Sequence, residues 1–146
     1  MELLNLPPYQ FKLKKADDRV QIFDAIRKKY VVLTPEEWVR QNFLQYLIQE
    51  KNYPSSLIVL EASLKYNQLQ KRADVLVYDK SGIPLLMVEC KAPSVKITQD
   101  TFDQVARYNM IFKVKYLIVT NCLNHFCCLI DYSDNSYRYL EMIPAF

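Results

Sequence analysis

The chain of 146 residues contains one glycine and one histidine, and each scarcity argues against a familiar kind of site. With Gly82 alone, the sequence has no GxGxxG and no Walker motif, which excludes a glycine-rich phosphate loop. The one histidine, His125, lies at the start of a predicted strand, where a lone histidine is usually structural, so a Ser/His/Asp or Cys/His catalytic set is not favoured. Any chemistry is therefore expected to depend on other side chains.

Long apolar runs are also missing. No run approaches the roughly 20 residues that a membrane helix needs. The charges of the N-terminus follow its short apolar patch, which is the wrong order for a signal peptide. We expect a cytoplasmic protein with no membrane partner, in which the four cysteines are reduced.

The cysteines near the C-terminus suggest a zinc site. Three of them, Cys122, Cys127 and Cys128, lie near His125 in the sequence. Adjacent residues of a strand point to opposite faces, so Cys127 and Cys128 cannot both face one ion. The sequence also has no CxxC pair. These thiols are expected to be small buried side chains.

The remaining composition is that of an ordinary globular domain, with 51% apolar and 24% charged residues. The net charge of +3 is compatible with a polyanionic partner but too small to indicate one. We expect a single domain over residues 1–146. It would comprise an N-terminal arm or β-meander with two short strands in 1–33, a core in 34–132 and a C-terminal strand in 133–146.

Local signals predict two helices and six strands after residue 33. Thr34 is the expected N-cap of a first helix, with Pro35 at its first position and Glu37 at the capping-box position. The other elements are predicted as strands at 57–66, 73–79 and 84–92, a helix at 98–113, and strands at 115–121, 125–132 and 136–143.

The order of these elements predicts an α/β fold. A helix between the strands at 84–92 and 115–121 implies a right-handed crossover and parallel pairing of the two strands. The predicted architecture is a mixed central β-sheet flanked by helices on both faces.

The stretch "RADVLVYDKSGIPLLMVECKAP" carries charges inside two predicted strands. If Asp79 lies opposite Pro84, antiparallel counting places Asp74 opposite Glu89, with Lys91 on the same face. Two facing carboxylates repel, and a divalent cation such as Mg²⁺ between them removes the conflict. The alternative, a solvated sheet face with three unrelated charges, remains open on geometry alone.

An Asp on one strand followed by Glu-x-Lys on the next resembles the PD-(D/E)XK nuclease superfamily. With "EEWVRQ" before it and "FDQVARYN" after it, the stretch looks like the N-terminal nuclease domain of type I restriction enzyme R (HsdR) subunits and their stand-alone relatives. The resemblance covers residues 34–132. It implies a restriction-endonuclease-like αβββαβ core and hydrolysis of DNA phosphodiester bonds with Mg²⁺ or Mn²⁺.

The resemblance implies roles for particular residues. Asp74 and Glu89 would be metal ligands together with the backbone carbonyl of Cys90, and Lys91 would be the catalytic lysine. The family's Glu-x-x-Arg pattern falls on Glu37 and Arg40.

A glutamate of that pattern often lies near the metal. A capping box explains Glu37 equally well, and Glu36 is a less favoured substitute.

Further positions are implied around this centre. Gln104-x-x-x-Tyr108 resembles a motif whose side chains line the site in RecB-like nucleases, although a surface Gln beside a partly buried Tyr also fits. Lys71 and Arg72 directly precede Asp74 and would meet DNA phosphates, unless they belong to a solvated loop.

The sequence also departs from the family. Ala73 replaces the proline that often precedes the aspartate, and the chain contains no helicase motor. We therefore expect a free-standing relative or an excised domain, with DNA as partner, a helicase or translocase or other restriction subunits as further candidates, and self-association left open. The alternative function is a catalytically silent nucleic-acid-binding or assembly module on the same fold.

Overall fold

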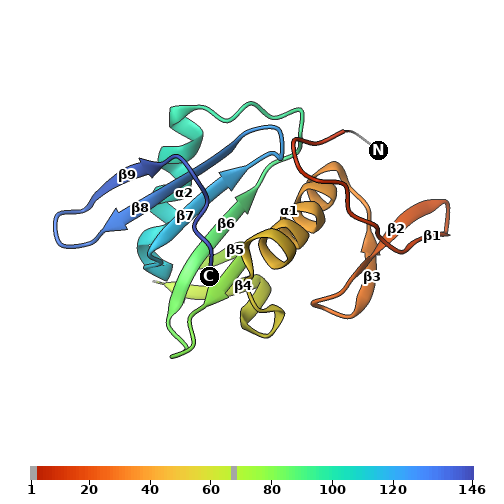
Figure 1. Cartoon of the computed structure of the whole chain (residues 1–146), viewed down its shortest axis with the longest axis horizontal. Coiled ribbons are helices and arrows are strands. Elements are labelled where there is room, and N and C mark those ends of the chain that lie inside the picture. Colours follow the sequence, from red (N-terminus) through yellow and green to blue (C-terminus); the bar gives the residue numbers. More distant parts are fainter. Residues whose placement is uncertain (1–2, 67–68) are drawn as a thin grey trace.

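The computed structural model describes residues 3–66 and 69–146, with side chains described apart from those of 64–66, 69–71 and 108–111. Two sheets and two α-helices form an α/β fold (Figure 1). The small sheet contains β1 (Leu13–Ala16), β2 (Arg19–Asp24) and β3 (Lys29–Val32). The large sheet contains β4 (Ile58–Tyr66), β5 (Leu69–Tyr78), β6 (Pro84–Cys90), β7 (Tyr116–Thr120), β8 (His125–Asp131) and β9 (Ser136–Leu140).

Helix α1 (Pro35–Lys51) begins and ends where its local signals place it. The Thr34 hydroxyl accepts a hydrogen bond from the Glu37 N–H at 3.0 Å, which satisfies one of the free donors of the first turn. At the other end Asn52 adopts a left-handed conformation with φ of 63°, which stops the helix. A single turn of 3-10 helix, Ser55–Leu57, then leads into β4.

The large sheet is mixed, as predicted. Its strands lie in sequence order from β4 to β9, and among the described residues only β6 and β7 pair in parallel. Helix α2 (Gln99–Phe112) makes the crossover between these two strands, and the Thr98 hydroxyl caps its first turn by accepting a hydrogen bond from the Thr101 N–H. Within the described residues, neither helix is both long and apolar enough to cross a membrane.

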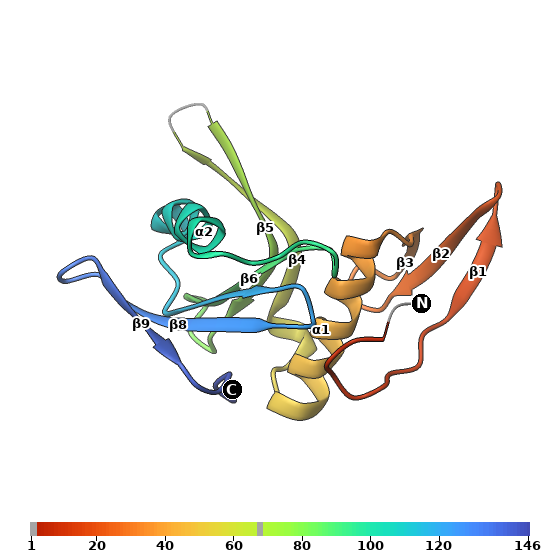
Figure 2. The same cartoon turned by 90° about the horizontal axis from the view of Figure 1, so that it is seen from above.

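Each helix covers one face of the large sheet, so the core has two halves (Figure 2). The half on the α1 side is centred on Phe43, Leu47, Val75, Val88 and Ile118. The half on the α2 side contains Phe102, Val105, Leu76, Met87 and Leu117. Cys127 belongs to the first half and Cys128 to the second, as strand alternation predicts.

Three sequence-based boundaries need correction. Tyr78, not Asp79, lies opposite Pro84, and a β-bulge follows, after which Val77 pairs with Leu86. Strand β5 begins at Leu69, so the segment before Asp74 is strand rather than loop. The N-terminal region forms a meander of three strands instead of two, because the stretch 19–24 pairs on both of its sides.

Strands β4 and β5 both change face at one point. Leu60 and Val75 pack on the α1 side, whereas Ala62 and Ala73, two residues away along each strand, pack on the α2 side. Glu61 lies between Leu60 and Ala62 with φ of +56°, a left-handed conformation that costs a residue other than glycine on the order of 1 kcal/mol or more. The irregularity redirects side chains at this point of the sheet.

The packing of α1 can be tested by removing its central ring. Phe43 is fully buried, so Phe43→Ala is expected to lower the free energy of unfolding by about 3–5 kcal/mol. Urea denaturation followed by circular dichroism measures this change. Met142→Ala is the control, since that side chain is 72% exposed and its loss should change stability by less than about 0.5 kcal/mol. Equal losses in the two variants would contradict the assigned core.

Candidate active site

Asp74 and Glu89 meet at the end of the β5–β6 hairpin that lies nearest the start of α1. The ladder between the two strands ends at Val75 and Val88, which places the two carboxyl groups just beyond it. One Asp74 oxygen, Oδ2, accepts a hydrogen bond from the Cys90 N–H at 2.7 Å. The Lys91 Nζ lies 3.5 Å from Glu89 Oε1. The structure therefore brings together Asp74, Glu89, the Cys90 backbone and Lys91.

The two carboxyl groups are close enough to change each other's ionisation. Desolvation and the negative charge of Asp74 raise the pKa of Glu89 to about 7, and a hydrogen bond to Asp74 favours its protonated form. Desolvation also raises the pKa of Asp74, although the Cys90 N–H and the Arg40 charge act in the opposite direction. Both carboxyl groups are therefore harder to ionise than ordinary carboxyl groups, mainly because they are buried.

Arg40 is the residue of α1 whose positive charge lies beside the Asp74–Glu89 pair. Its side chain is buried, and its guanidinium donates to Glu37 at 2.9 Å and to Glu61 at 2.6 Å. The same group lies 4.0 Å from Asp74 Oδ1. Because Glu61 is on β4 and Asp74 on β5, this one side chain ties α1 to both strands where they change face.

The N-terminal meander is joined to the same network. Asp24, which is fully buried, accepts hydrogen bonds from Arg27 Nε at 2.6 Å and from Gln41 Nε2 at 3.0 Å. Arg27 in turn donates to Glu37 at 3.1 Å. A continuous series of opposite charges therefore runs from the meander through Glu37 to Arg40 and the site.

A cavity of about 200 Å³ opens beside these groups. It is lined by Thr34, Glu36, Glu37, Arg40, Glu61, Asp74 and Cys90. The two helix glutamates that line this cavity differ in their surroundings. Glu37 is occupied by Arg27, Arg40 and Gln41, whereas burial and the charge of Asp74 raise the pKa of Glu36, which lies at the more exposed rim.

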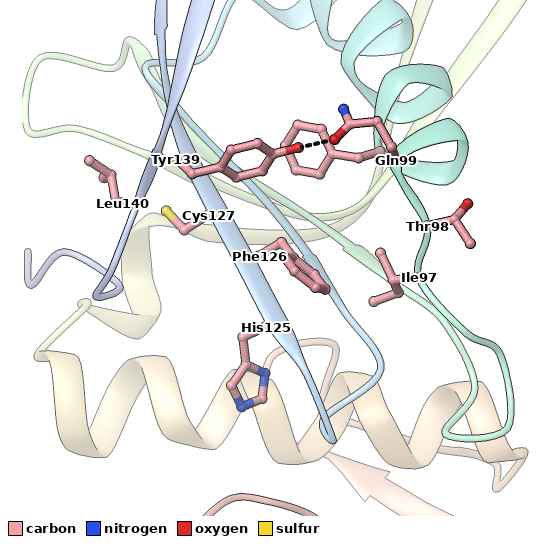
Figure 3. Close-up of a pocket in the computed structure, with 9 residues that line it drawn as sticks. Ile97, Thr98, Gln99, His125, Phe126, Cys127, Tyr139 and Leu140 are labelled. Atoms are coloured by element: carbon pink, nitrogen blue, oxygen red, sulfur yellow. Dashed lines mark hydrogen bonds between the residues drawn. The ribbon is translucent and has the colours of Figure 1, made fainter.

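A larger cavity of about 370 Å³ lies elsewhere, between the start of α2 and the β8–β9 hairpin (Figure 3). The described residues that line it include Phe102, Phe126 and Tyr139, and none of them is acidic. Tyr139 donates a hydrogen bond to Gln99 at 3.2 Å across its wall. The larger cavity is lined by His125, but the smaller one is the cavity with clustered carboxyl groups, which are the groups that the predicted chemistry requires.

Comparison with known proteins identifies a family for most of this chain. The family described as "Type I restriction enzyme R protein N terminus (HSDR_N)" matches residues 35–144. This chain belongs to that family. A search of curated proteins found no match.

A solved structure shares the fold of this HSDR_N family member. It is described as a fragment of an HsdR subunit of a type I restriction enzyme from Vibrio vulnificus YJ016, with a TM-score of 0.54 and 22% sequence identity. The similarity covers 77% of the present chain and 24% of the other. The chain thus corresponds to about a quarter of that longer protein.

Some residues expected near the centre of an HSDR_N domain lie apart from it or outside the described side chains. Gln104 is exposed on α2 and is absent from the described lining of the smaller cavity. The side chains of Tyr108 and Lys71 fall outside the described part of the chain. Arg72 is 62% exposed and lies 3.5 Å from Glu61, so it remains accessible at the edge of the site.

Two members of the site were missed by sequence reasoning. Glu61 interrupts the apolar alternation of "LIVLEASLKY", which is the one local signal that it carries. Arg27 has no such signal, because its contact with Glu37 depends on how the meander packs on α1. Glu61 and Arg27 belong to the site through ion pairs with residues distant in the sequence, which a local sequence pattern cannot predict.

The donor set can be tested for its fit to a metal ion. Among the described residues, no group of three or more His, Cys, Asp or Glu side chains is arranged to hold an ion. A Mg²⁺ ion requires fewer protein ligands than this, because it retains several waters and is commonly bound through one or two carboxylates. The close Asp74–Glu89 pair, with its raised pKa values, is a set of hard oxygen donors that a divalent cation would stabilise.

The raised pKa of Glu89 predicts a pH-dependent loss of stability in EDTA. A carboxyl group whose folded-state pKa, about 7, exceeds its ordinary value of 4.5 stabilises the fold below that ordinary value, and this contribution is lost as pH rises through 7. Glu89→Gln should therefore be more stable than wild type at pH 8 by at most about 3 kcal/mol, with little difference at pH 4.

Urea unfolding of both proteins across this pH range measures the difference. Glu141→Gln serves as the control for the loss of one negative charge at an exposed position. A difference between Glu89→Gln and wild type that stays constant with pH would refute the assigned environment of Glu89.

Proposed function

We propose that this HSDR_N domain is a Mg²⁺-dependent endonuclease that hydrolyses phosphodiester bonds in DNA. The observation that carries the proposal is the placement of Asp74, Glu89 and Lys91 around one point, beside the Cys90 backbone. Two close carboxylates and a neighbouring lysine are the groups that metal-assisted phosphodiester hydrolysis requires. Membership of the family supports the same reading.

Asp74 and Glu89 would hold the ion, with the carbonyl of Cys90 as a further ligand. When bound, Mg²⁺ would supply Lewis-acid stabilisation of the charge that develops on the phosphate. The hydrogen bond from the Cys90 N–H keeps Asp74 oriented, and Arg40 fixes the strands that carry it. Glu36, at the rim of the cavity, is the better placed of the two helix glutamates to assist from α1.

Lys91 would act on the reacting atoms. Its side chain is about one-third exposed and lies beside Glu89, so it can reach both the ion site and a phosphate entering from solvent. A lysine there can orient the attacking water or stabilise developing negative charge. We assign Gln104, Tyr108, Lys71 and Arg72 to positioning of the DNA.

The biological partners follow from the family. Domains of this kind resemble a part of type I restriction R proteins, so a helicase or translocase, or other restriction subunits, are the proposed protein partners. The alternative function, a silent DNA-binding module, is an outcome of the experiments below.

Metal binding should be measurable as stabilisation. Asp74→Asn removes one of two repelling charges, so in EDTA it should leave the melting temperature unchanged or raise it. Mg²⁺ or Mn²⁺ at about 100 times its dissociation constant should stabilise wild type by about 2.7 kcal/mol and the variant much less. Thermal denaturation with each ion measures this, with Asp100→Asn on α2 as the control. Equal stabilisation of wild type and Asp74→Asn would count against a metal site at Asp74.

A DNA cleavage assay should distinguish the role of Lys91 from that of the carboxylates. Lys91→Ala should reduce nicking of supercoiled plasmid by about 100-fold or more while it retains metal-induced stabilisation, because transition-state contacts of this kind have that magnitude. Glu89→Ala should lose both properties. Lys80→Ala, at the opposite end of the hairpin, is the matched control.

Wild-type rates in Lys91→Ala would refute the role of Lys91. A wild-type protein that binds DNA but does not cut with either ion would favour the silent binding module.

A further inference from the structure

One face of the N-terminal meander is basic and aromatic. Strand pairing places Lys14 opposite Gln21 and Phe23 opposite Tyr30, so these side chains share one face. Their shared face also carries Arg19, opposite Ala16. The other face holds the fully buried Ile22 and Asp24 and is turned toward the body of the protein. We call the first face, with Lys12, Lys14, Arg19, Phe23 and Tyr30, the basic outer face.

The rings of this face support its cations. Phe23 and Tyr30 pack edge to face with centroids 5.2 Å apart. The Lys14 Nζ lies 4.2 Å from the Tyr30 centroid, and the Lys12 Nζ lies 5.7 Å from the Phe23 centroid. The amines of Lys12 and Lys14 thus pack over aromatic rings. Lys12, Lys14 and Arg19 are all exposed, so their charged groups are accessible to a ligand.

The charge of the chain is concentrated in this element. Residues 12–33 contain seven basic and three acidic residues, a net charge of +4, whereas the whole chain carries +3. The remainder of the molecule is therefore slightly acidic. One of the three acids, Asp24, is buried against Arg27 and adds nothing to the surface. Attraction of a polyanion is directed to the meander.

The meander is placed beside the candidate site. It precedes residues 35–144, which are the part of the chain that the family pattern matches. Arg27 and Asp24 join it to Glu37 and Gln41 in the first turns of α1, and Glu37 lines the cavity. Figure 2 shows the β1–β3 sheet alongside the start of α1. The meander as a whole therefore borders the candidate site, with its basic outer face turned away from the body of the protein.

We propose that the basic outer face binds the phosphodiester backbone of DNA, on an element that borders the candidate site with Asp74 and Glu89. The choice of DNA rests on the proposed function, but the binding step is separate from cleavage. Lys12, Lys14 and Arg19 supply contacts to phosphates, which give affinity without sequence preference. Phe23 and Tyr30 supply apolar surface for sugars or bases.

The test compares two triple variants in DNA binding. Lys12→Gln/Lys14→Gln/Arg19→Gln removes three charges from the basic outer face. Lys80→Gln/Lys113→Gln/Lys115→Gln removes three exposed charges at the opposite end of the large sheet and is the matched control. Anisotropy of a fluorescein-labelled oligonucleotide, as a single strand and as a duplex, is measured in EDTA over a range of salt concentrations. EDTA prevents any metal-dependent cleavage during the measurement.

The first variant should bind about 10-fold or more weakly, and its salt slope should fall by about 2–3, close to one phosphate contact per removed charge. The control should bind as wild type does. Lys12→Arg/Lys14→Arg/Arg19→Lys retains the charges and should restore binding, and circular dichroism checks that each variant is folded. The two DNA forms show whether single strand or duplex is the preferred ligand.

The inference is overturned if the first variant keeps wild-type affinity, if the control loses as much, or if wild type binds neither probe. The outcome is independent of the nuclease assignment. A protein that binds through this face but never cuts retains the inference and loses the proposed activity. A protein that cuts, while its triple variant binds normally, retains the activity and loses the inference.

Discussion

One buried guanidinium holds three parts of the molecule together. Arg40 projects from α1 and contacts Glu37 on the same helix, Glu61 on β4 and the neighbourhood of Asp74 on β5. Burial alone lowers the pKa of Arg40, but its hydrogen bonds to Glu37 and Glu61 raise it above the ordinary value. Without this cation Glu61 would be left with the longer contact to Arg72 at 3.5 Å, whereas Glu37 would still accept hydrogen bonds from Arg27 and Gln41. The relative positions of the helix and the two strands depend on this interaction, while Arg27 and Asp24 join the meander to the same helix.

The same region contains a local conflict that the fold does not remove. Arg40 and Lys91 are the cations nearest to Glu61, Asp74 and Glu89, and the pKa of Glu89 still rises to about 7. In addition, Glu61 has a positive φ that a non-glycine residue rarely adopts. Violations of charge pairing and backbone preference in one place are characteristic of functional sites, where binding of a ligand supplies the missing stabilisation.

Local chemistry made much of this structure predictable, and long-range contacts account for the rest. Thr34 and Asn52 mark α1 because a cap acts within a few residues. The facing positions of Asp74 and Glu89 were derived from the pair Asp79 and Pro84, which is wrong because the loop is one residue longer than assumed. The bulge after Pro84 shifts the register by one residue in the opposite direction, so the two errors cancel at Val75 and Val88. Glu61 was not predictable, because its conformation and contact with Arg40 join residues far apart in the sequence.

The sequential order of the large sheet has a consequence for how the protein is made. Each strand from β4 to β9 pairs with the one that follows it along the chain, so an emerging polypeptide can add strands one after another. The residues of the candidate site have all emerged once Lys91 is made, but β6 is then an unpaired edge and the Lys91 N–H still lacks its acceptor, the carbonyl of Thr120 on β7. Until β7 arrives, that edge is open to association with other chains. In the folded protein β7 pairs with that edge, so the C-terminal half of the domain protects the strand bearing Glu89 from edge-to-edge association.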